Sequence, residues 1–579
     1  MYQFSDQTEG KETVFTIKSQ DVKFGVGALR ELWSDARSLG MNQIALFLDS
    51  NIKASKPISL ILESFQSSGL EVDIYDAVVC EPNTSSCMAA ADFVKQGEYD
   101  GIVSIGGGSV MDTAKAANLL SCHGGEILDY VNAPIGLAKK VPGPLLPHIA
   151  CPTTSGTGAE TTGIVVLDIE EVGLKSGISS PHLKPNHAIV DPETTLTLPS
   201  GVIASTGFDV LTHAVESYVA RPYTSSDRPL DPSLRMGYQG ATPYNDIGAL
   251  AAIRIGGKYL LRAVQNDQDE EARFQLMFAA TLAGLAFNSA GVHIPHAMSY
   301  SVATLKHEYT AKGYEKLPPM APHGIAVVLN APAAFRFTGP TNPERHLEVA
   351  QAMGIDTRDA KLEDAGMILA DCFIDLMKKT GIPNGLGALG YSEHDVPALA
   401  EGGFAQQRPL SMSPCTVSEE DLKNLYPLSV VDVVSHRIAN QVYQGLLRFD
   451  QETLEIREGI AKSWRISYDG LEYTFNLREG VLFHDDPCFP EGKGREVTAE
   501  DVRYCFTKLC EYDGNNKLFG MFQDRVLGAT EYYEASKAGN ATGMSVTGIT
   551  VSGDYEVKIR LEKPFAAFDK VIAHNCCWI

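Results

Sequence analysis

Short apolar runs alternate with helical patterns over residues 20–190, and this alternation constrains the fold more than any other feature of the chain. Each run is rich in β-branched residues and is followed by a segment with apolar residues at helical spacing. Strands that alternate with helices usually pair in parallel. The sequence therefore predicts an α/β domain with a mostly parallel sheet over residues 1–195. Its strands are expected at residues 42–49, 70–76, 99–109, 148–154 and 186–192.

The pattern changes near residue 200, where long helical segments follow one another with few convincing strands. Residues 203–220 and 271–287 are two such segments, each with apolar residues at helical spacing. We therefore expect an all-helical domain over residues 196–428. Within it, the polar stretch of residues 221–246 is expected to be a long ordered loop or flap.

A third unit is expected over residues 429–579, because the chain is too long for one hydrophobic core and its pattern changes again. Residues 473–485 alternate between apolar and polar at strand period. Residues 498–509 begin with a capping box, formed by Thr498 and Asp501, and continue as a helical pattern. These features predict an α+β fragment.

Composition excludes several classes of protein. The chain has 44% apolar and 21% charged residues, which is typical of globular proteins, and its formal charge of -24 disfavours contact with nucleic acid. It contains no apolar run of the roughly 18–20 residues that a membrane span needs. The beginning of the sequence has no basic, apolar signal segment, and the 11 cysteines include no C-x-x-C pair. We therefore expect a cytoplasmic protein without a membrane span.

Three consecutive glycines, Gly106, Gly107 and Gly108, lie between an expected strand and an expected helix. Such a turn lets the backbone approach a pyrophosphate at the positive end of the helix. The turn lacks the G-x-G-x-x-G pattern, and Ser109 with Asp112 also matches a capping box, so an ordinary helix start is the alternative.

Two further features occur where expected strands end. Asp49 is placed to accept hydrogen bonds from a ribose and to repel a 2'-phosphate, although it could instead cap the next helix. Residues 151–163 form a small, hydroxyl-rich loop after another strand. Ligands of open α/β sheets bind at these strand ends. Together with the glycine turn, these features favour a dinucleotide site.

Imidazole and carboxylate side chains recur in the expected helical domain. Asp209 and His213 are four residues apart, so one face of a helix presents both. His293, His296 and His323 follow in two later motifs, although a single histidine on a helix is more often structural. Three imidazoles and one carboxylate suit Fe(II) or Zn(II). A metal beside a nicotinamide is what oxidation of an alcohol requires.

Residues 15–428 resemble the iron-containing alcohol dehydrogenases. The resemblance implies the dehydroquinate synthase-like fold of that family, with an α/β nucleotide-binding domain and an all-helical metal-binding domain. It also implies that Asp209, His213, His296 and His323 bind one divalent metal and are the catalytic centre. The motifs that carry the resemblance are GGGSVMDTAKAAN, PTTSGTGAETTG, IVDPETTLTLP, STGFDVLTHAVESY, GVHIPHAMSY and PHG.

The same resemblance implies NAD as the cofactor, with Asp49 selecting NAD over NADP. Lys175 is part of the implied site, although a lysine in isolation is usually a solvated surface charge. The chain departs from many members at Tyr300, where they have a histidine, and this argues against proton relay at that position. The residues implied to line the NAD site are Asp49, Gly107, Gly108, Ser109, Asp112, Thr153, Thr154 and Lys175.

Within this family the chain resembles the hydroxyacid-oxoacid transhydrogenases. The shared stretches are YQGATPYNDIGALAAIRI, AGVHIPHAMSY, FRFTGPTNPERHLEVA and LGALGYSEHDVPALAEG. This resemblance implies hydride transfer from 4-hydroxybutyrate through NAD to 2-oxoglutarate. An NAD-dependent primary alcohol dehydrogenase is the alternative within the enzyme class. The sequence does not identify the cation that binds the substrate carboxylate, and it leaves a homo-oligomer open.

From about residue 429 the sequence resembles a different family, the family-5 solute-binding proteins of ABC transporters. The stretches that carry this resemblance are YQGLLRFD, IAKSWRISYDGLEYTFNLREGVLFHD, VTAEDVRYCFTKL and VKIRLEKPFAAF. Such proteins bind peptides between two lobes, whereas only about 150 residues are similar here. A peptide-binding transport component is thus the rival function. We expect instead a truncated fusion that binds no peptide, with activity confined to residues 1–428.

Overall fold

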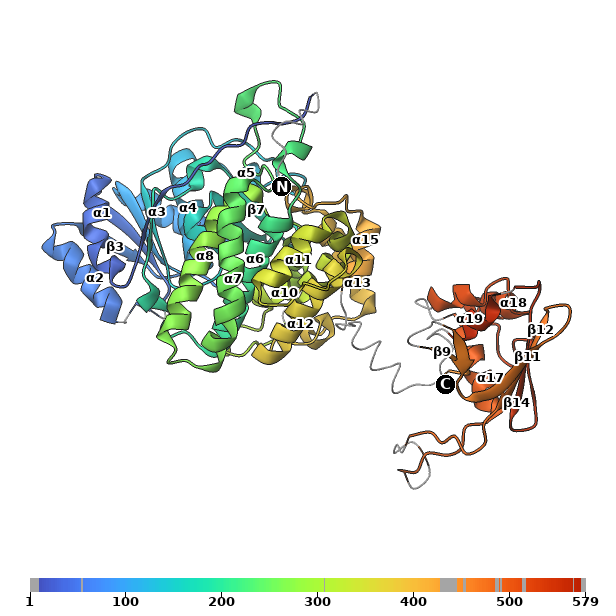
Figure 1. Ribbon diagram of the computed structural model, residues 1–579. Coiled ribbons are helices and arrows are strands. Elements are labelled where there is room, and N and C mark those ends of the chain that lie inside the picture. The colour runs from blue at the N-terminus through green and yellow to red at the C-terminus, as the bar shows by residue number, and fades with distance from the viewer. Residues whose placement is uncertain are drawn as a thin grey trace. The chain divides into compact units, whose positions relative to one another are not determined.

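The chain folds into two compact units, Met1–Val430 and Val431–Ile579. Figure 1 shows the computed structural model, with helices packed beside a sheet in the first unit and a smaller sheet in the second. The structure describes residues 10–426, except 51, 54, 55 and 307, and residues 445–573, except 451–454, 485–488, 490, 491, 513–516 and 566.

A six-stranded sheet in the order β1-β8-β5-β4-β2-β3 forms the centre of the N-terminal part, and every pairing in it is parallel. This confirms the α/β prediction and its five strands. Edge strand β1 was not predicted, because its four residues are all at least partly exposed and carry no apolar run. The strands are β1 (Asp21–Phe24), β2 (Gln43–Leu48), β3 (Glu71–Tyr75), β4 (Gly101–Gly106), β5 (His148–Pro152) and β8 (His187–Val190).

Helices cover both faces of this sheet, which explains why its central strands are apolar throughout. In β2, Leu46 packs in one core with α1 and α2, while Phe47 packs in a second core with α3 and α4. Figure 1 shows α1 and α2 near the blue end of the sheet. The helices are α1 (Leu32–Ser38), α2 (Lys56–Ser67), α3 (Thr84–Gln96), α4 (Gly108–His123) and α5 (Ile127–Tyr130).

An antiparallel hairpin of β6 (Ile164–Ile169) and β7 (Leu174–Ser179) follows β5. Gly173, with a φ of +63°, supports its turn because glycine adopts this conformation without a steric cost. The hairpin was not predicted. It contacts the first part of α4 through a hydrogen bond from the Val166 amide to Asp112.

The remainder of the first unit is helical, as predicted. Helix α6 (Ser200–Val219) packs against α7, α8 and α10, and most of its residues are buried. The expected loop at residues 221–246 contains two short 3-10 helices and ends earlier than predicted, because α7 begins at Pro243. The other helices are α7 (Pro243–Gln265), α8 (Glu270–Ala290), α9 (Ile294–Thr304), α10 (His323–Thr338), α11 (Pro343–Ala352), α12 (Ala365–Thr380), α13 (Val396–Phe404), α14 (Gln407–Leu410) and α15 (Glu419–Leu425).

No single helix among the described residues is long and apolar enough to cross a membrane. Helices α8 and α9 meet that criterion only as a pair, and they are bent by 103° relative to each other. The expected domain boundary at residues 195/196 lies just before α6, and it stays a prediction, because both parts belong to one compact unit.

The second unit has its own sheet and its own buried core. Its four antiparallel strands lie in the order β11-β12-β14-β13, beside a separate β9-β10 pair. The capping box predicted at Thr498 and Asp501 is present at the start of α17 (Ala499–Leu509). The described elements are β9 (Leu447–Phe449), β10 (Ile456–Glu458), β11 (Ala461–Ile466), β12 (Glu472–Leu477), α18 (Ala529–Lys537), β13 (Ile549–Ser552), β14 (Glu556–Arg560) and α19 (Phe568–Ile572).

We predict that a chain ending at Val430 keeps the unfolding temperature of the first unit, because that unit contains complete hydrophobic cores of its own. Differential scanning calorimetry of the full chain should then show a second transition that the shortened chain lacks. Aggregation of the shortened chain, or a fall of its unfolding temperature by more than about 5 °C, would contradict this prediction.

Candidate active site

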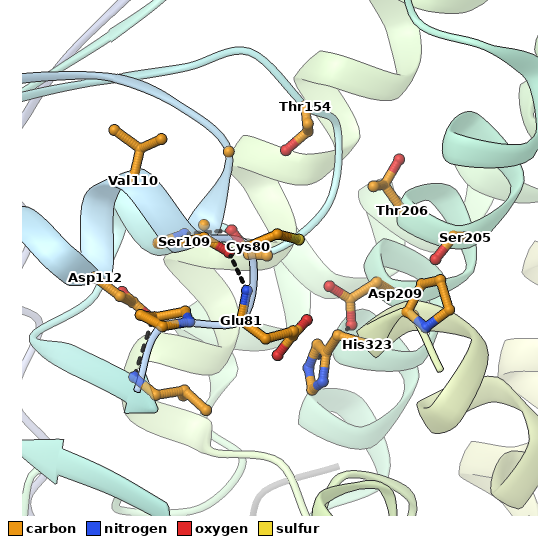
Figure 2. A pocket seen from close by; sticks show the side chains of 18 of the residues that line it. Cys80, Glu81, Ser109, Val110, Asp112, Thr154, Ser205, Thr206, Asp209 and His323 are labelled. Atoms are coloured by element: carbon orange, nitrogen blue, oxygen red, sulfur yellow. Dashed lines mark hydrogen bonds and ion pairs between the residues drawn. The ribbon is translucent and has the colours of Figure 1, made fainter. Parts of the chain in front are cut away.

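A cleft of about 700 Å³ lies where the carboxyl ends of the parallel strands face the helical part of the first unit. Figure 2 shows residues of both parts that line it. The cleft brings together every residue of the predicted site except Lys175. It therefore combines the nucleotide features of the α/β part with the imidazoles of the helical part.

The glycine turn joins β4 to α4, and no side chain caps the helix start that follows it. A Cβ atom on Gly108 would lie 2.7 Å from Cγ2 of Thr157, so only glycine fits where the turn meets the hydroxyl-rich loop. Thr153 and Thr154 of that loop also line the cleft. The uncapped helix start offers its backbone N–H groups and its dipole to an anion such as a pyrophosphate.

Ser109 and Asp112 do not form the capping box that was the alternative interpretation. The Ser109 hydroxyl accepts a hydrogen bond from the Glu81 amide at 3.2 Å. Asp112 accepts one from Val166 at 2.9 Å and forms an ion pair with Lys115 at 3.4 Å. The two side chains thus bind the backbone at Glu81 and at Val166 to the start of α4.

Asp49 directly follows β2 and lines the cleft. The alternative that Asp49 caps the next helix is wrong, because α2 begins at Lys56. Its position at a strand end agrees with the predicted contact to a ribose.

Lys175 is buried rather than exposed, which corrects the surface-charge alternative. Its ammonium lies 2.7 Å from a carboxylate oxygen of Glu81 and 2.8 Å from one of Asp168. Glu81 has a φ of +56°, which is uncommon for a residue with a side chain and often marks a functional site. Figure 2 shows its carboxylate facing His323. Lys175 thus does not line the cleft itself but contacts Glu81, which does. Its contact with NAD stays a prediction.

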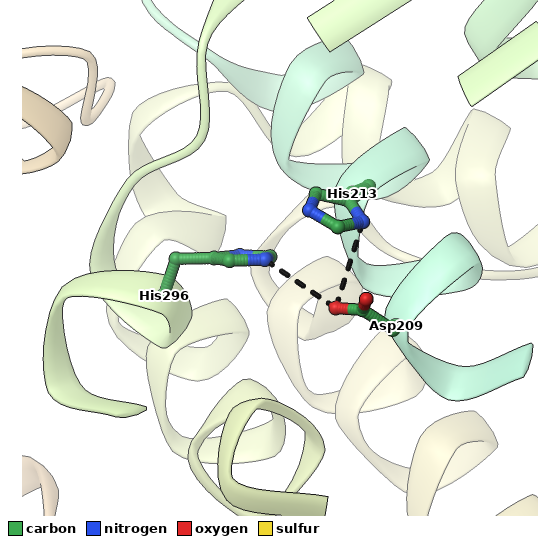
Figure 3. A group of neighbouring side chains, drawn as sticks. All are labelled: Asp209, His213 and His296. Carbon is green, nitrogen blue, oxygen red and sulfur yellow. Dashed lines mark ion pairs between the residues drawn. The ribbon is translucent and has the colours of Figure 1, made fainter. Parts of the chain in front are cut away.

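The four predicted metal ligands meet around one carboxylate oxygen. Oδ1 of Asp209 lies 3.5 Å from Nδ1 of His213, 3.6 Å from Nε2 of His296 and 3.8 Å from Nε2 of His323. Figure 3 shows the first three side chains, whose ligand atoms lie within 4.8 Å of one another. Ligands arranged tetrahedrally about 2.1 Å from Zn or Fe are about 3.4 Å apart, so a cation fits between these three atoms. His323 is not part of this group, and its place as the fourth ligand stays a prediction.

The polarity of these atoms also fits a cation. Oδ1 of Asp209, Nδ1 of His213 and Nε2 of His296 are buried and have no hydrogen-bond partner among the described residues. Leaving buried polar atoms unpaired is costly, and a metal ion would satisfy all three. Although burial alone raises the pKa of Asp209, the surrounding imidazoles lower it well below its usual range, so the carboxylate is ionised.

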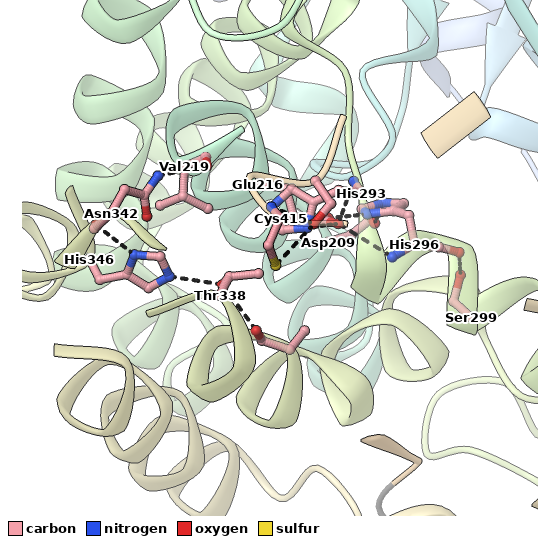
Figure 4. Close-up of polar contacts among 12 residues, drawn as sticks. Asp209, Glu216, Val219, His293, His296, Ser299, Thr338, Asn342, His346 and Cys415 are labelled. Atoms are coloured by element: carbon pink, nitrogen blue, oxygen red, sulfur yellow. Dashed lines mark hydrogen bonds and ion pairs between the residues drawn. The ribbon is translucent and has the colours of Figure 1, made fainter. Parts of the chain in front are cut away.

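Glu216 orients the His296 ring through its Nδ1, on the side away from Asp209. It accepts hydrogen bonds from Nδ1 of His296 and, at 2.8 Å, from the backbone amide of His293. Figure 4 shows Glu216 beside these two histidines. The bond fixes the tautomer of His296 and leaves Nε2 free to bind a metal. Burial lowers the pKa of His296, but Glu216 and Asp209 outweigh it and raise the pKa to about 9, so a cation would displace a proton there.

Sequence reasoning assigned no role to several residues of this site. Glu216 follows His213 by three positions and Asp209 by seven, so its helical spacing could have revealed that it shares their face. For Glu81 and Arg408, which also line the cleft, the local sequence offers no comparable signal.

Two family models match most of the first unit. One, described as iron-containing alcohol dehydrogenase, matches residues 19–192. The second, the C-terminal part of the same family, matches residues 237–430. The chain belongs to the iron-containing alcohol dehydrogenase family. It is therefore an oxidoreductase that acts on small molecules, and the predicted resemblance is confirmed.

This family member is similar to curated proteins named hydroxyacid-oxoacid transhydrogenase, mitochondrial. It is 45% identical to the rat protein over 73% of the chain and 91% of that protein. It is 44% identical to the human protein over the same shares.

Solved structures of dehydrogenases share the fold of the first unit. A 1,3-propanediol oxidoreductase is 27% identical, with a TM-score of 0.62 over 71% of this chain and 99% of that one. A sulfoacetaldehyde reductase from Bifidobacterium kashiwanohense, solved in complex with NAD+, is also 27% identical, with a TM-score of 0.59 over 72% of this chain and 100% of that one.

A third family model matches residues 455–576, in the second unit of this dehydrogenase. It is described as bacterial extracellular solute-binding proteins, family 5 middle. The change of family predicted near residue 429 is thus confirmed.

We predict that replacing His296 or His323 by alanine removes most of the bound metal and lowers activity about 100-fold or more, because the remaining ligands cannot close the site. Metal content by mass spectrometry and turnover with an alcohol test this. His182→Ala, which alters an exposed histidine, is the control. Full metal retention with near-normal turnover in either variant would reject the assignment.

We also predict that Glu216→Gln, which preserves size but removes the charge behind His296, weakens metal binding about 10- to 100-fold. Competition with a chelator measures the affinity, and Glu271→Gln, which alters an exposed side chain on α8, serves as the control. An unchanged affinity in Glu216→Gln would show that Glu216 does not support the ligand.

Proposed function

We propose that the enzyme is a hydroxyacid-oxoacid transhydrogenase. It takes hydride from 4-hydroxybutyrate onto NAD and delivers it to 2-oxoglutarate, giving succinic semialdehyde and 2-hydroxyglutarate. The observation that carries the proposal is the identity of 44–45% to proteins of this name over 91% of their length, which includes both walls of the cleft.

In the proposal, the α/β wall of the cleft binds the cofactor and the helical wall binds the metal. In the proposal, the uncapped start of α4 holds the pyrophosphate of NAD, and Asp49 accepts hydrogen bonds from the ribose and disfavours NADP. Asp209, His213, His296 and His323 hold one divalent metal, Fe(II) or Zn(II), since imidazole and carboxylate suit both. When bound, this metal supplies a Lewis acid for the hydroxyl or carbonyl oxygen of the substrate.

Tyr300 lines the cleft near these ligands, with its ring centre 6.4 Å from that of His323. Burial raises its pKa well above the usual range of a phenol. The phenol is therefore protonated at neutral pH and can donate a hydrogen bond to a substrate. This supports the expectation that it does not relay protons as a histidine would.

An NAD-dependent primary alcohol dehydrogenase is the alternative, since the family as a whole supports that broader activity. We keep the cytoplasm as the proposed location, although the curated relatives are named as mitochondrial proteins. A homo-oligomer is part of the proposal. We assign the activity to the first unit and no peptide binding to the second.

We predict that metal-loaded protein with one equivalent of NAD and no excess converts 4-hydroxybutyrate and 2-oxoglutarate to 2-hydroxyglutarate over many turnovers. Chromatography with mass detection measures the product. If the rate of product formation does not change when more NAD is added, the cofactor is reduced and reoxidised while it stays bound. A rate that rises with added NAD indicates a cofactor that exchanges with solution. Absence of 2-hydroxyglutarate, combined with NADH formation from simple alcohols and excess NAD, would favour the plain dehydrogenase.

A further inference from the structure

Both proposed substrates are carboxylates, so the cleft needs a cation at a fixed place. Among the described residues that line the cleft, lysine and arginine occur at Lys316 and Arg408. Lys316 is exposed, in the segment before α10. Arg408 lies in α14 and is half-buried. A half-buried guanidinium binds a carboxylate more strongly than an exposed ammonium, because water screens it less.

The guanidinium of Arg408 is held in place by an aromatic ring. Its Cζ atom lies 3.8 Å from the ring centre of Tyr238, a buried residue that also lines the cleft. No carboxylate of a described residue forms an ion pair with Arg408. The stacking positions the guanidinium beside Tyr238, so its charge faces the cleft without a carboxylate partner among the described residues.

A second donor lies on the same wall of the cleft. Tyr300 lies on α9, which packs against α14, the helix that carries Arg408. Its ring also lies near His323, one of the four predicted metal ligands. Tyr300 therefore lines the same cleft as the guanidinium and the predicted metal ligands, so its O–H is available to a substrate bound there.

We propose that Arg408, assisted by the O–H of Tyr300, binds the substrate carboxylate that is remote from the reacting carbon, and that it does so in both half-reactions. The proposal rests on the proposed transhydrogenase function. A guanidinium suits this task, because it donates two parallel hydrogen bonds to one carboxylate.

One arginine can serve both substrates because their spacing is the same. In 4-hydroxybutyrate, two methylene groups separate the hydroxyl-bearing carbon from the carboxylate. In 2-oxoglutarate, two methylene groups separate the carbonyl carbon from the distal carboxylate. With that carboxylate on Arg408, each reacting carbon is held at the same distance from the arginine, and thus at the same place for hydride transfer.

The two half-reactions balance through the cofactor. The donor loses hydride from its C–H bond to NAD and a proton from its hydroxyl, and becomes an aldehyde. The acceptor gains hydride from NADH at its carbonyl carbon and a proton at its oxygen, and becomes a 2-hydroxy acid. No further oxidant or reductant is needed.

The first test uses the full-length, metal-loaded enzyme with NAD and compares 4-hydroxybutyrate with 1-butanol, which has the same chain length but no carboxylate. In Arg408→Leu, the ratio of kcat/KM for 4-hydroxybutyrate to that for 1-butanol is expected to fall 10- to 100-fold. The ratio for Arg408→Lys should lie between those of Arg408→Leu and the wild type, since lysine keeps the charge but loses the paired donors.

Lys316→Gln is the matched comparison, because it removes the other cation of the cleft. Its ratio should equal that of the wild type. A fall in the ratio for Lys316→Gln with none for Arg408→Leu would overturn the proposal. Equal losses for both substrates in Arg408→Leu would overturn it as well, since they would indicate a purely structural role.

The second test varies the acceptor. The wild type should prefer 2-oxoglutarate to oxaloacetate, which has one methylene fewer, and to 2-oxoadipate, which has one more. Arg408→Leu should lose most of this preference. A preference that persists unchanged in the variant would assign the length selection to another group.

A third measurement separates this proposal from the proposed function. If the wild type oxidises 1-butanol but gives no transhydrogenation, the transhydrogenase function fails. Inhibition of 1-butanol oxidation by 4-hydroxybutyrate then tests Arg408 alone. Weaker inhibition of Arg408→Leu than of the wild type, by tenfold or more, would support the arginine, and equal inhibition would reject it.

Discussion

The meeting of three imidazoles at one buried carboxylate oxygen, Oδ1 of Asp209, is the constraint on which the helical half of the enzyme depends. Three separate helices must bring His213, His296 and His323 to the same point. Without a cation, the site buries polar atoms that lack partners. The packing of α10 against α6 and α9 is therefore also the means by which the predicted metal ligands are brought together.

The α/β half depends on a different constraint, the close approach of two loops. Gly108 and Thr157 come so near to each other that a methyl group would not fit between them. This approach leaves the start of α4 open toward the cleft. A cofactor bound there and a metal bound by the helical half would face the same substrate, so the two halves form one active site.

Local patterns predicted much of this structure. The strand and helix periods gave the parallel sheet and the helical domain, and the capping box at Thr498 gave a helix start. The β6–β7 hairpin was not predicted, although its contacts are local. The roles of Glu81 and Arg408 were not predicted, because they depend on contacts between segments far apart in the chain. Glu81 lies 94 residues from Lys175, its ion-pair partner. Only folding reveals such neighbours.

The ion group of buried Lys175 with Glu81 and Asp168 contains one ammonium and two carboxylates, which together carry a net negative charge. The carboxylate of Glu81 presents this charge to the cleft, whereas Arg408 presents a positive charge from the helical part. The cleft is thus electrically polar. In the proposed function, this polarity would turn an entering hydroxy acid with its carboxylate away from Glu81 and its hydroxyl end toward the predicted metal ligands.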